Sequence, residues 1–442
     1  MQGRRYVITS AYIASLGGLL FGFDTAVISG AEKTIQELFD LNGFWLGFTV
    51  AIALVGTLVG TLISGKPADI MGRKKSLILI AVIYAVSALG SALSDSWITF
   101  LIYRFLGGIA VGASSVIGPM YIAEISPAGM RGRLVTSFQL NIVFGILLSY
   151  FSNYWISKVV EHDAWRWMLG VLSIPSVIFF LLVLYIPDSP RWLVLKNRVE
   201  DAKKVLRRLG SLDYEKEIKE IEESISGTDG VKHSYLFTKI YSIPIMLAIL
   251  VAIFNQLSGI NAIMYYAPRI FELVGYAKSS ALLQSVSVGV TLFSFTVLGM
   301  FLIDRVGRKK LLLVGSVGMA FFLGMVARTI FLTTDGSIWM LIYLSGFIAF
   351  FSFSQGTVIW VYISEIFPNT VRAKGQTLGS FTHWVMAVII SWMFPALTES
   401  NAGGWAFAFF SASMILQFFL VLRIFPETKG KSLEQIQKEM IS

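Results

Sequence analysis

The sequence contains no cysteine, which excludes disulfides, thiolate metal sites and cysteine nucleophiles. Histidine is nearly as scarce, because His162, His233 and His383 are its only copies. They are scattered and show no metal-ligand spacing, so we expect no metal and no cofactor. No serine–histidine–aspartate arrangement is evident either, and we do not expect an enzyme.

Charge is also scarce, at 14% of 442 residues, whereas soluble proteins carry about 25%. The charges lie between long apolar runs, each sufficient for a membrane-spanning helix of about 20 residues. A soluble chain of this size could not bury so many runs in one core. We therefore predict an all-α membrane protein with twelve transmembrane helices. The runs are about 7–29, 43–64, 76–94, 98–121, 134–156, 166–187, 243–266, 281–303, 311–332, 338–363, 375–397 and 404–425.

The formal net charge is +9, which in a soluble protein would suggest a nucleic-acid partner. The positive-inside rule of membrane proteins explains this positive charge better. We therefore expect the protein to contact membrane lipid and not to bind nucleic acid. With a cytoplasmic N-terminus, most Lys and Arg fall in inner loops, including the long loop 188–242. The outer loops carry only Lys33, Lys158, Arg166, Arg269 and Lys278. We expect a multi-pass protein of the cell (inner) membrane with both termini in the cytoplasm.

Internal repetition predicts two halves. DIMGRKK at 69–75 returns as DRVGRKK at 304–310, and EISPAGMRGR at 124–133 returns as EIFPNTVRAK at 365–374. Because six is even, two six-helix halves would lie parallel in the membrane, as in transporters that bind substrate between their halves. The predicted divisions are the first half at 1–187, a linker with short cytoplasmic helices at 188–242, the second half at 243–425 and a cytoplasmic tail at 426–442.

One stretch resembles a phosphate-binding loop but does not match its motif. GTLISGKP at 60–67 nearly matches G-x-x-x-x-G-K-[ST], but Pro67 replaces the hydroxyl residue that would hold magnesium. The stretch also ends a membrane helix instead of following a strand. ATP-driven pumping by this chain alone is therefore not expected.

The repeated inner motifs combine Arg with carboxylates at fixed spacing. Pairs between loops of the two halves could hold the inner side shut while the outer side is open. A simpler interpretation is that these residues only set orientation and cap helices, but basic residues alone would suffice for that. The candidate gate residues are Glu124, Arg131, Glu365 and Arg372, with Asp69 and Arg73, or Asp304 and Arg308, paired within each half.

Asp24 lies in the apolar stretch GGLLFGFDTAVISG, and Arg104 lies in the fourth run. A charge at mid-bilayer costs roughly 2.5–3.5 kcal/mol on insertion scales, so each is the natural partner of the other. The cation lowers the pKa of a paired carboxylate and burial raises it. A conformational change could alter that balance and load or unload a proton. The alternative is a fixed structural ion pair.

The seventh run carries the most polar membrane stretch, FNQLSGINAIMYYAP. Ser258, Asn261 and Tyr265 share a helix face, and a break at Gly259 could bring Gln256 to that face. Neutral amides beside aromatic rings suit a neutral polyhydroxylated solute. Helix–helix hydrogen bonding is the alternative. Other polar or aromatic groups of the predicted site are Gln139, Trp360, His383 and Trp384.

The chain resembles the sugar porter family of the major facilitator superfamily, and within it the bacterial pentose and hexose proton symporters. The resemblance covers nearly the whole chain and rests on GGLLFGFDTAVISG, GRKK twice, YRFLGG, PMYIAEISPAGMRGR, PDSPRWL, NQLSGINAIMYYAP, WVYISEIFPNTVRAKG and PETKGKSLE. It implies the major facilitator fold, with Asp24 as the proton-coupling carboxylate and Arg104 as its partner. The implied sugar contacts are Gln139, Gln256, Asn261, Tyr265 and Trp360, with Phe21, Gly356 and Trp384 lining the cavity.

Four positions depart from the family pattern. Leu292 stands where an Asn is common in the eighth helix, and QGTVIW in the tenth lacks the usual proline after Gly356. Asn255 stands where the first amide of the seventh-helix pair is usually Gln, and His383 replaces the amide before Trp384. We expect a secondary active transporter that couples a proton to a neutral monosaccharide by alternating access and works as a monomer. The alternatives are a facilitator with the same site and a sugar receptor. A receptor would be expected to carry long cytoplasmic extensions.

Overall fold

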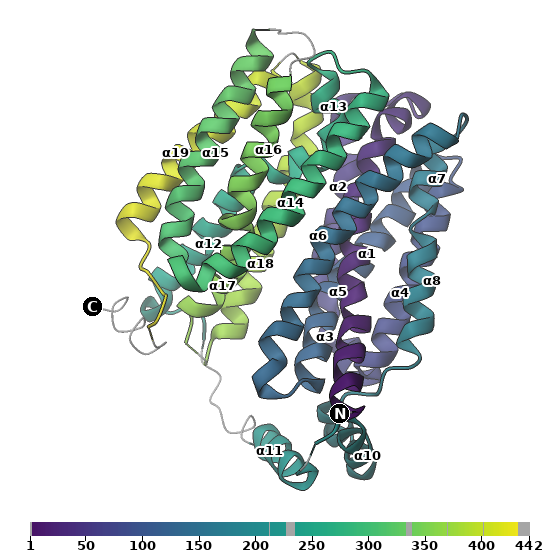
Figure 1. Ribbon diagram of the computed structural model, residues 1–442, viewed down its shortest axis with the longest axis vertical. Helices are drawn as coiled ribbons and strands as arrows, with labels where there is room; N and C mark the ends of the chain where they lie inside the picture. Colours follow the sequence, from purple (N-terminus) through teal and green to yellow (C-terminus); the bar gives the residue numbers. More distant parts are fainter. Residues whose placement is uncertain are drawn as a thin grey trace. The chain divides into compact units, whose positions relative to one another are not determined.

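The structure is a computed structural model that describes residues 2–211, 213–226, 235–332, 338–368, 370–400 and 402–431. Parts of the predicted linker (212 and 227–234) and of the predicted tail (432–442) lie outside the described residues. Within the described ranges every regular element is a helix and no strand is present (Figure 1). The predicted all-α class is confirmed.

Twelve helical spans in this part of the chain are long and apolar enough to cross a membrane, as predicted. They are formed by α1 (Gln2–Leu38), α2 (Gly43–Ile63), α4 (Arg73–Ala92), α5 (Trp97–Ile125), α6 (Ala128–Val159), α7 and α8 (Ala164–Gly170, Ser173–Val183), α12 and α13 (Ser242–Leu257, Ile260–Glu272), α14 (Lys278–Val306), α15 (Arg308–Phe331), α16 and α17 (Ile338–Phe353, Gln355–Ile366), α18 (Arg372–Glu399) and α19 (Gly403–Ile424).

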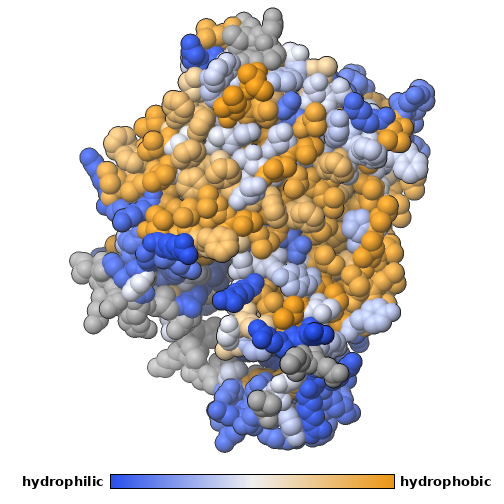
Figure 2. All heavy atoms as spheres, viewed as in Figure 1, coloured by the Kyte–Doolittle hydropathy of each residue, from blue (hydrophilic) through white to orange (hydrophobic). Residues whose placement is uncertain are grey.

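Large apolar side chains are exposed along these helices, as lipid contact requires. Ile98, Phe301 and Phe321 are each more than half exposed. Figure 2 shows hydrophobic residues over much of the helix surface, with hydrophilic residues gathered around α10 (Val199–Leu209) and α11 (Tyr214–Ser226).

The remaining helices are short. They are α3 (Gly65–Met71), α9 (Pro190–Leu195), α10, α11 and a 3₁₀ turn at Lys239–Tyr241. The short helices predicted for the linker are therefore present. Helices α9, α10 and α11 share a small core in which Trp192, Leu206 and Ile218 are buried. The indole of Trp192 also donates a hydrogen bond to the carbonyl of Asp69, which fixes α9 to α3, the short helix between the second and third spans.

The chain folds into two compact units. The first comprises residues 1–25, 55–149 and 166–233, and the second comprises 26–54, 150–165 and 234–442. The unit boundaries cut α1, α2, α6 and the first turn of α7. The distal ends of α1, α2 and α6 therefore group with the later part of the chain. By distal we mean the end of α1 at Leu38, away from residue 2. The division into halves at 188–242 is a division by sequence and stays a prediction.

The second unit contains a helix break at the position predicted from the sequence. Gly259 has φ +80° and separates α12 from α13. A Cβ at this glycine would meet a ring carbon of Phe410 at 2.4 Å. Both the backbone conformation and the close packing therefore require glycine. A second irregularity follows at Tyr266, two residues before Pro268.

Candidate functional site

Asp24 and Arg104 form a buried ion pair in the first unit. Arg104 of α5 donates from Nη1 to Oδ1 of Asp24 in α1 over 2.8 Å. The residues are only 3% and 2% exposed. Gly107 lies one turn beyond Arg104, and a Cβ there would meet Oγ of Ser87 at 2.4 Å. The absence of a side chain at Gly107 thus lets α4 and α5 approach each other beside the carboxylate.

The ion pair is incomplete on the arginine side. Nε and Nη2 of Arg104 are buried, and neither has a hydrogen-bond partner in the described part of the chain. A guanidinium offers five N–H donors, so much of its charge here is balanced by one carboxylate. Protonation of Asp24 would leave that buried cation without a counter-charge. The pair is therefore an arrangement in which one proton changes the electrostatic balance of the unit's interior.

The amides of the seventh span meet at the break in the second unit. Nε2 of Gln256 donates to Oδ1 of Asn255 over 3.1 Å and lies 3.3 Å from both ring nitrogens of His383. Asn255 and Gln256 are 2% and 1% exposed, and Oε1 of Gln256 is buried without a partner within the described residues. A buried acceptor that lacks a donor is suited to a ligand hydroxyl.

Aromatic rings surround His383 on α18. The ring of Trp360 from α17 lies 5.0 Å from the imidazole, and the ring of Trp384 lies 5.1 Å from it, edge-on. Trp360 is 37% exposed, so one face of this cluster is open. The structure thus brings together five of the predicted substrate residues, namely Asn255, Gln256, Trp360, His383 and Trp384.

The other predicted substrate residues are placed as follows. Asn261 is half-buried and Tyr265 is buried, both on α13. Gly356 is half-buried in the first turn of α17. Phe21 on α1 and Gln139 on α6 are half-buried and belong to the first unit.

The repeated Arg–carboxylate motif forms an ion-pair cluster in the first unit. Arg73 at the start of α4 pairs with Glu124 at 2.9 Å and with Asp69 at 3.2 Å. Ser189 donates its hydroxyl to the second oxygen of Glu124 at 2.5 Å. Arg73 is 5% exposed and Glu124 is nearly buried with it, whereas the carboxylate of Asp69 is exposed to solvent.

The second unit contains the same cluster. Arg308 at the start of α15 pairs with Glu365 at 2.8 Å and with Asp304 at 3.1 Å, and Thr428 donates to Glu365. Neighbouring contacts repeat as well. Tyr121 donates to the carbonyl of Pro187 in one unit, and Tyr362 donates to the carbonyl of Pro426 in the other. The sequence repeats therefore correspond to repeated local structures.

The remaining two gate candidates make weaker contacts. Arg131 donates to the carbonyl of Ser126, and Arg372 donates to the carbonyl of Phe367, both at 3.4 Å. Neither makes an ion pair among the residues that the structure describes. The glutamates Glu124 and Glu365 instead pair with Arg73 and Arg308 of their own units. Pairing between the two halves, as expected from the sequence, stays a prediction.

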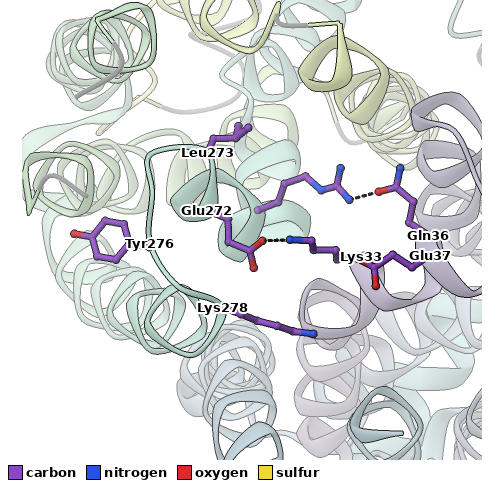
Figure 3. A pocket seen from close by; sticks show the side chains of 8 residues that line it. Lys33, Gln36, Glu37, Glu272, Leu273, Tyr276 and Lys278 are labelled. Carbon is purple, nitrogen blue, oxygen red and sulfur yellow. Dashed lines mark hydrogen bonds and ion pairs between the residues drawn. The ribbon is translucent and has the colours of Figure 1, made fainter. Parts of the chain in front are cut away.

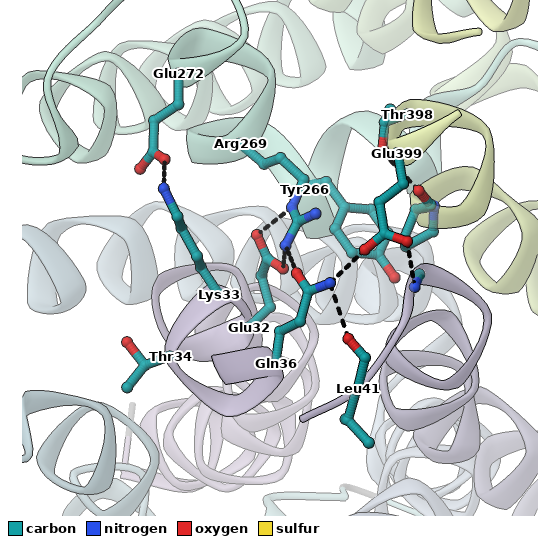
Figure 4. Close-up of polar contacts among 12 residues, drawn as sticks. Glu32, Lys33, Thr34, Gln36, Leu41, Tyr266, Arg269, Glu272, Thr398 and Glu399 are labelled. Atoms are coloured by element: carbon teal, nitrogen blue, oxygen red, sulfur yellow. Dashed lines mark hydrogen bonds and ion pairs between the residues drawn. The ribbon is translucent and has the colours of Figure 1, made fainter. Parts of the chain in front are cut away.

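The structure contains a polar network at the distal end of α1, which the sequence did not predict (Figure 4). Arg269 of α13 donates to both oxygens of Glu32 of α1, at 2.9 and 2.7 Å. Lys33 pairs with Glu272 at 2.5 Å. The sequence did contain a signal for this network, because Glu32 directly follows an apolar run and Arg269 is one of the few cations expected in the outer loops. The partners could not be known without the packing of α1 against α13.

Beside this network lies a pocket of about 530 Å³ in the second unit, where charges of both signs face one another (Figure 3). It is lined by Lys33, Gln36, Glu37, Arg269, Glu272, Leu273, Tyr276 and Lys278. Within the described residues no group of three or more His, Asp or Glu could hold a metal ion.

Comparison with known proteins agrees with this arrangement of membrane helices and buried polar groups. The family described as "Sugar (and other) transporter" matches residues 10–440. The chain belongs to this family. It is thus a multi-pass membrane transporter, and the predicted relationship to sugar porters is confirmed.

Several members of the sugar transporter family are similar over almost their whole length. The arabinose-proton symporter of Bacillus subtilis is 38% identical, over 98% of this chain and 95% of the relative. The D-xylose-proton symporter of Escherichia coli is 35% identical with the same coverage. A solved inward-open structure of the xylose transporter XylE from E. coli has a TM-score of 0.87 at 34% identity, over 98% of this chain and 99% of that one.

Proposed function

We propose that this transporter carries a neutral monosaccharide, a pentose or a hexose, together with a proton. The observation that carries the proposal is the buried Asp24–Arg104 pair, in which the cation has no second carboxylate partner within the described residues. Membership of the sugar transporter family, with relatives named as arabinose- and xylose-proton symporters, supports it.

In this proposal Asp24 carries the proton and Arg104 sets its affinity. When Asp24 is ionised, its charge and that of Arg104 balance each other inside the protein. When Asp24 is protonated, the cation is left partly uncompensated, and the conformation that best hydrates Arg104 is favoured. Proton binding thus changes the relative free energies of the two conformations that alternating access requires.

The sugar would be bound by the cluster at the helix break. Gln256 supplies the unpartnered buried acceptor, His383 a ring nitrogen, and Trp360 a flat apolar surface for the sugar ring. Asn255, Asn261, Tyr265, Gly356 and Trp384 would complete this part of the site, and Gln139 and Phe21 are the other proposed sugar contacts. The contacts described for Gln256 and His383 are with neutral groups, which is consistent with a neutral solute.

The Arg73 and Arg308 clusters, with Arg131 and Arg372, would form the cytoplasmic gate. The topology is part of the proposal. Both termini and the helices of the central loop would lie in the cytoplasm, with the protein in the cell (inner) membrane and acting as a monomer. The bias of Lys and Arg between alternate loops supports this orientation.

The test uses proteoliposomes that contain a pH-sensitive dye, with no gradient imposed. Xylose, arabinose, glucose, galactose and fructose are added in turn while dye signal and radiolabelled sugar uptake are recorded. Internal acidification by one sugar establishes symport and identifies the substrate. Sugar entry without a pH change would make the protein a facilitator and Asp24–Arg104 a structural pair.

A further inference from the structure

The distal network joins residues that are far apart in the sequence. Glu32, Lys33 and Gln36 lie on α1, in the first sequence half, and Arg269 and Glu272 lie on α13, in the second. All of them belong to the same compact unit. The distal ends of α1, α2 and α6 are grouped there with residues 234–442, so these contacts are part of a packed structure.

The network is a connected set of charge-assisted hydrogen bonds centred on Glu32 (Figure 4). Glu32 is 2% exposed and accepts two bonds from the guanidinium of Arg269. The same guanidinium donates to Oε1 of Gln36, whose amide in turn donates to Glu399 at the end of α18. Two-bond arginine–carboxylate pairs are among the strongest polar contacts in proteins.

Glu399 extends the network to a fourth helix. Its Oε2 accepts the backbone N–H of Gly43, the first residue of α2, where the partial positive charge of a helix N-terminus favours a carboxylate. Together with Gln36, this contact ties the ends of α1 and α2 to α18. The pocket next to Arg269 and Glu272 opens beside these bonds (Figure 3), so water has access to one side of them.

We propose that Glu32, Gln36, Arg269 and Glu399 form an outer latch that holds the two sequence halves together at the distal end and must open once in each transport cycle. The proposal rests on the proposed transport function and its orientation, in which the distal end faces outward. The hydrogen bonds form only when α1 meets α13 and α18, so they stabilise the outwardly closed conformation alone and shift the equilibrium toward it.

The absence of cysteine allows a direct test, because a single introduced thiol has no background. Ser29 is 3% exposed and precedes Glu32 by one helical turn, so both lie on the same face of α1. Its hydroxyl donates only to the carbonyl of Ala26 in the same helix, so Ser29→Cys is a mild change. In intact cells, this thiol is exposed to an impermeant maleimide only while the latch is open.

We expect Glu32→Gln to raise the labelling rate of Ser29→Cys by about tenfold or more, because a buried arginine loses its carboxylate. Arg269→Gln should do the same, and the double variant should add little to either single change. The matched control is Asp95→Asn, which removes a carboxylate from the exposed pair with Arg166 within the first unit. This control should leave the labelling rate unchanged.

A second thiol reports on reagent access and folding. Leu38 is 52% exposed at the end of α1. A cysteine at this position, Leu38→Cys, should therefore label equally fast whichever latch residue is substituted. The latch is refuted if Ser29→Cys labels equally fast with Glu32 and with Glu32→Gln while Leu38→Cys and the melting temperature are normal. If Glu32→Gln does not fold, Arg269→Lys, which retains charge but loses the paired bonds, must give a smaller acceleration.

The labelling result does not depend on coupling to protons. A chain that moves sugar without protons would refute the symport proposal and still show the labelling change. Conversely, symport with unchanged labelling would leave the proposed function intact and remove the latch.

Discussion

At the scale of single residues, the proposed function depends on polar groups whose burial leaves their hydrogen bonding incomplete. Among the residues that the structure describes, two buried nitrogens of Arg104 and the buried carbonyl oxygen of Gln256 have no hydrogen-bond partner. An unsatisfied buried polar group costs about 1–3 kcal/mol. Such groups persist where a ligand, a proton or a second conformation supplies what the static structure lacks.

Asp24→Asn should abolish sugar accumulation against a gradient and spare sugar exchange. An amide cannot gain or lose a proton near neutral pH, but it retains the size and one acceptor of the carboxylate. The measurement is proton-driven uptake compared with counterflow in the same proteoliposomes. Loss of binding of every sugar would instead assign Asp24 a structural role.

Gln256→Ala should raise the apparent substrate constant severalfold, because each lost hydrogen bond to ligand contributes about 1 kcal/mol. Initial uptake rates over a range of sugar concentrations measure it. Gln376→Ala is the matched control, since Gln376 is exposed on α18, the helix that carries His383. Equal kinetics for the two variants would remove Gln256 from the site.

At the scale of secondary-structure elements, the proposed sugar site depends on the interruption of the seventh span. The break at Gly259 ends α12 directly after Gln256 and begins α13 just before Asn261. A continuous helix would place Gln256 on a different face from Asn261 and Tyr265. The break therefore allows amides from both segments to serve one site.

Gly259→Ala should destabilise the protein. The left-handed backbone costs a residue with a Cβ about 1–2 kcal/mol, and the contact with Phe410 adds to that cost. Thermal melting in detergent measures the effect. Gly129→Ala is the control, because Gly129 lies near the start of α6 with nothing within 4 Å of an added Cβ. If both variants melt together, the break is not required for stability.

At the scale of the whole molecule, the internal sequence repeats are expressed as duplicated local structure. Arg73 with Glu124 and Arg308 with Glu365 occupy equivalent places in their units, as do the two tyrosine–carbonyl contacts. The unit boundaries nevertheless cut α1, α2 and α6, because their distal ends pack with the later part of the chain. The outer latch belongs to this level, since its residues come from both sequence halves.

An even number of spans places both termini on one side of the membrane, and the charge bias predicts that this side is the cytoplasm. Reporter fusions at each end should therefore be active only if the reporter functions in the cytoplasm. A fusion to the loop after α1, at Asp40, should behave in the opposite way. An external reporter signal from either terminus would reverse the orientation and with it the assignment of the outer latch.

Much of this protein followed from the sequence alone. Twelve apolar runs, the short linker helices, the helix break and the Asp24–Arg104 pairing were all predicted, because lipid requires helices to be apolar and requires buried charges to be paired. The tertiary structure decided which of several possible partners each polar residue takes. Glu124 pairs with Arg73 and not with Arg131, and Glu32 pairs with Arg269, a contact that no sequence pattern indicated. Such choices depend on how helices rotate and cross in the packed protein, because hydrogen bonds form only within about 3 Å.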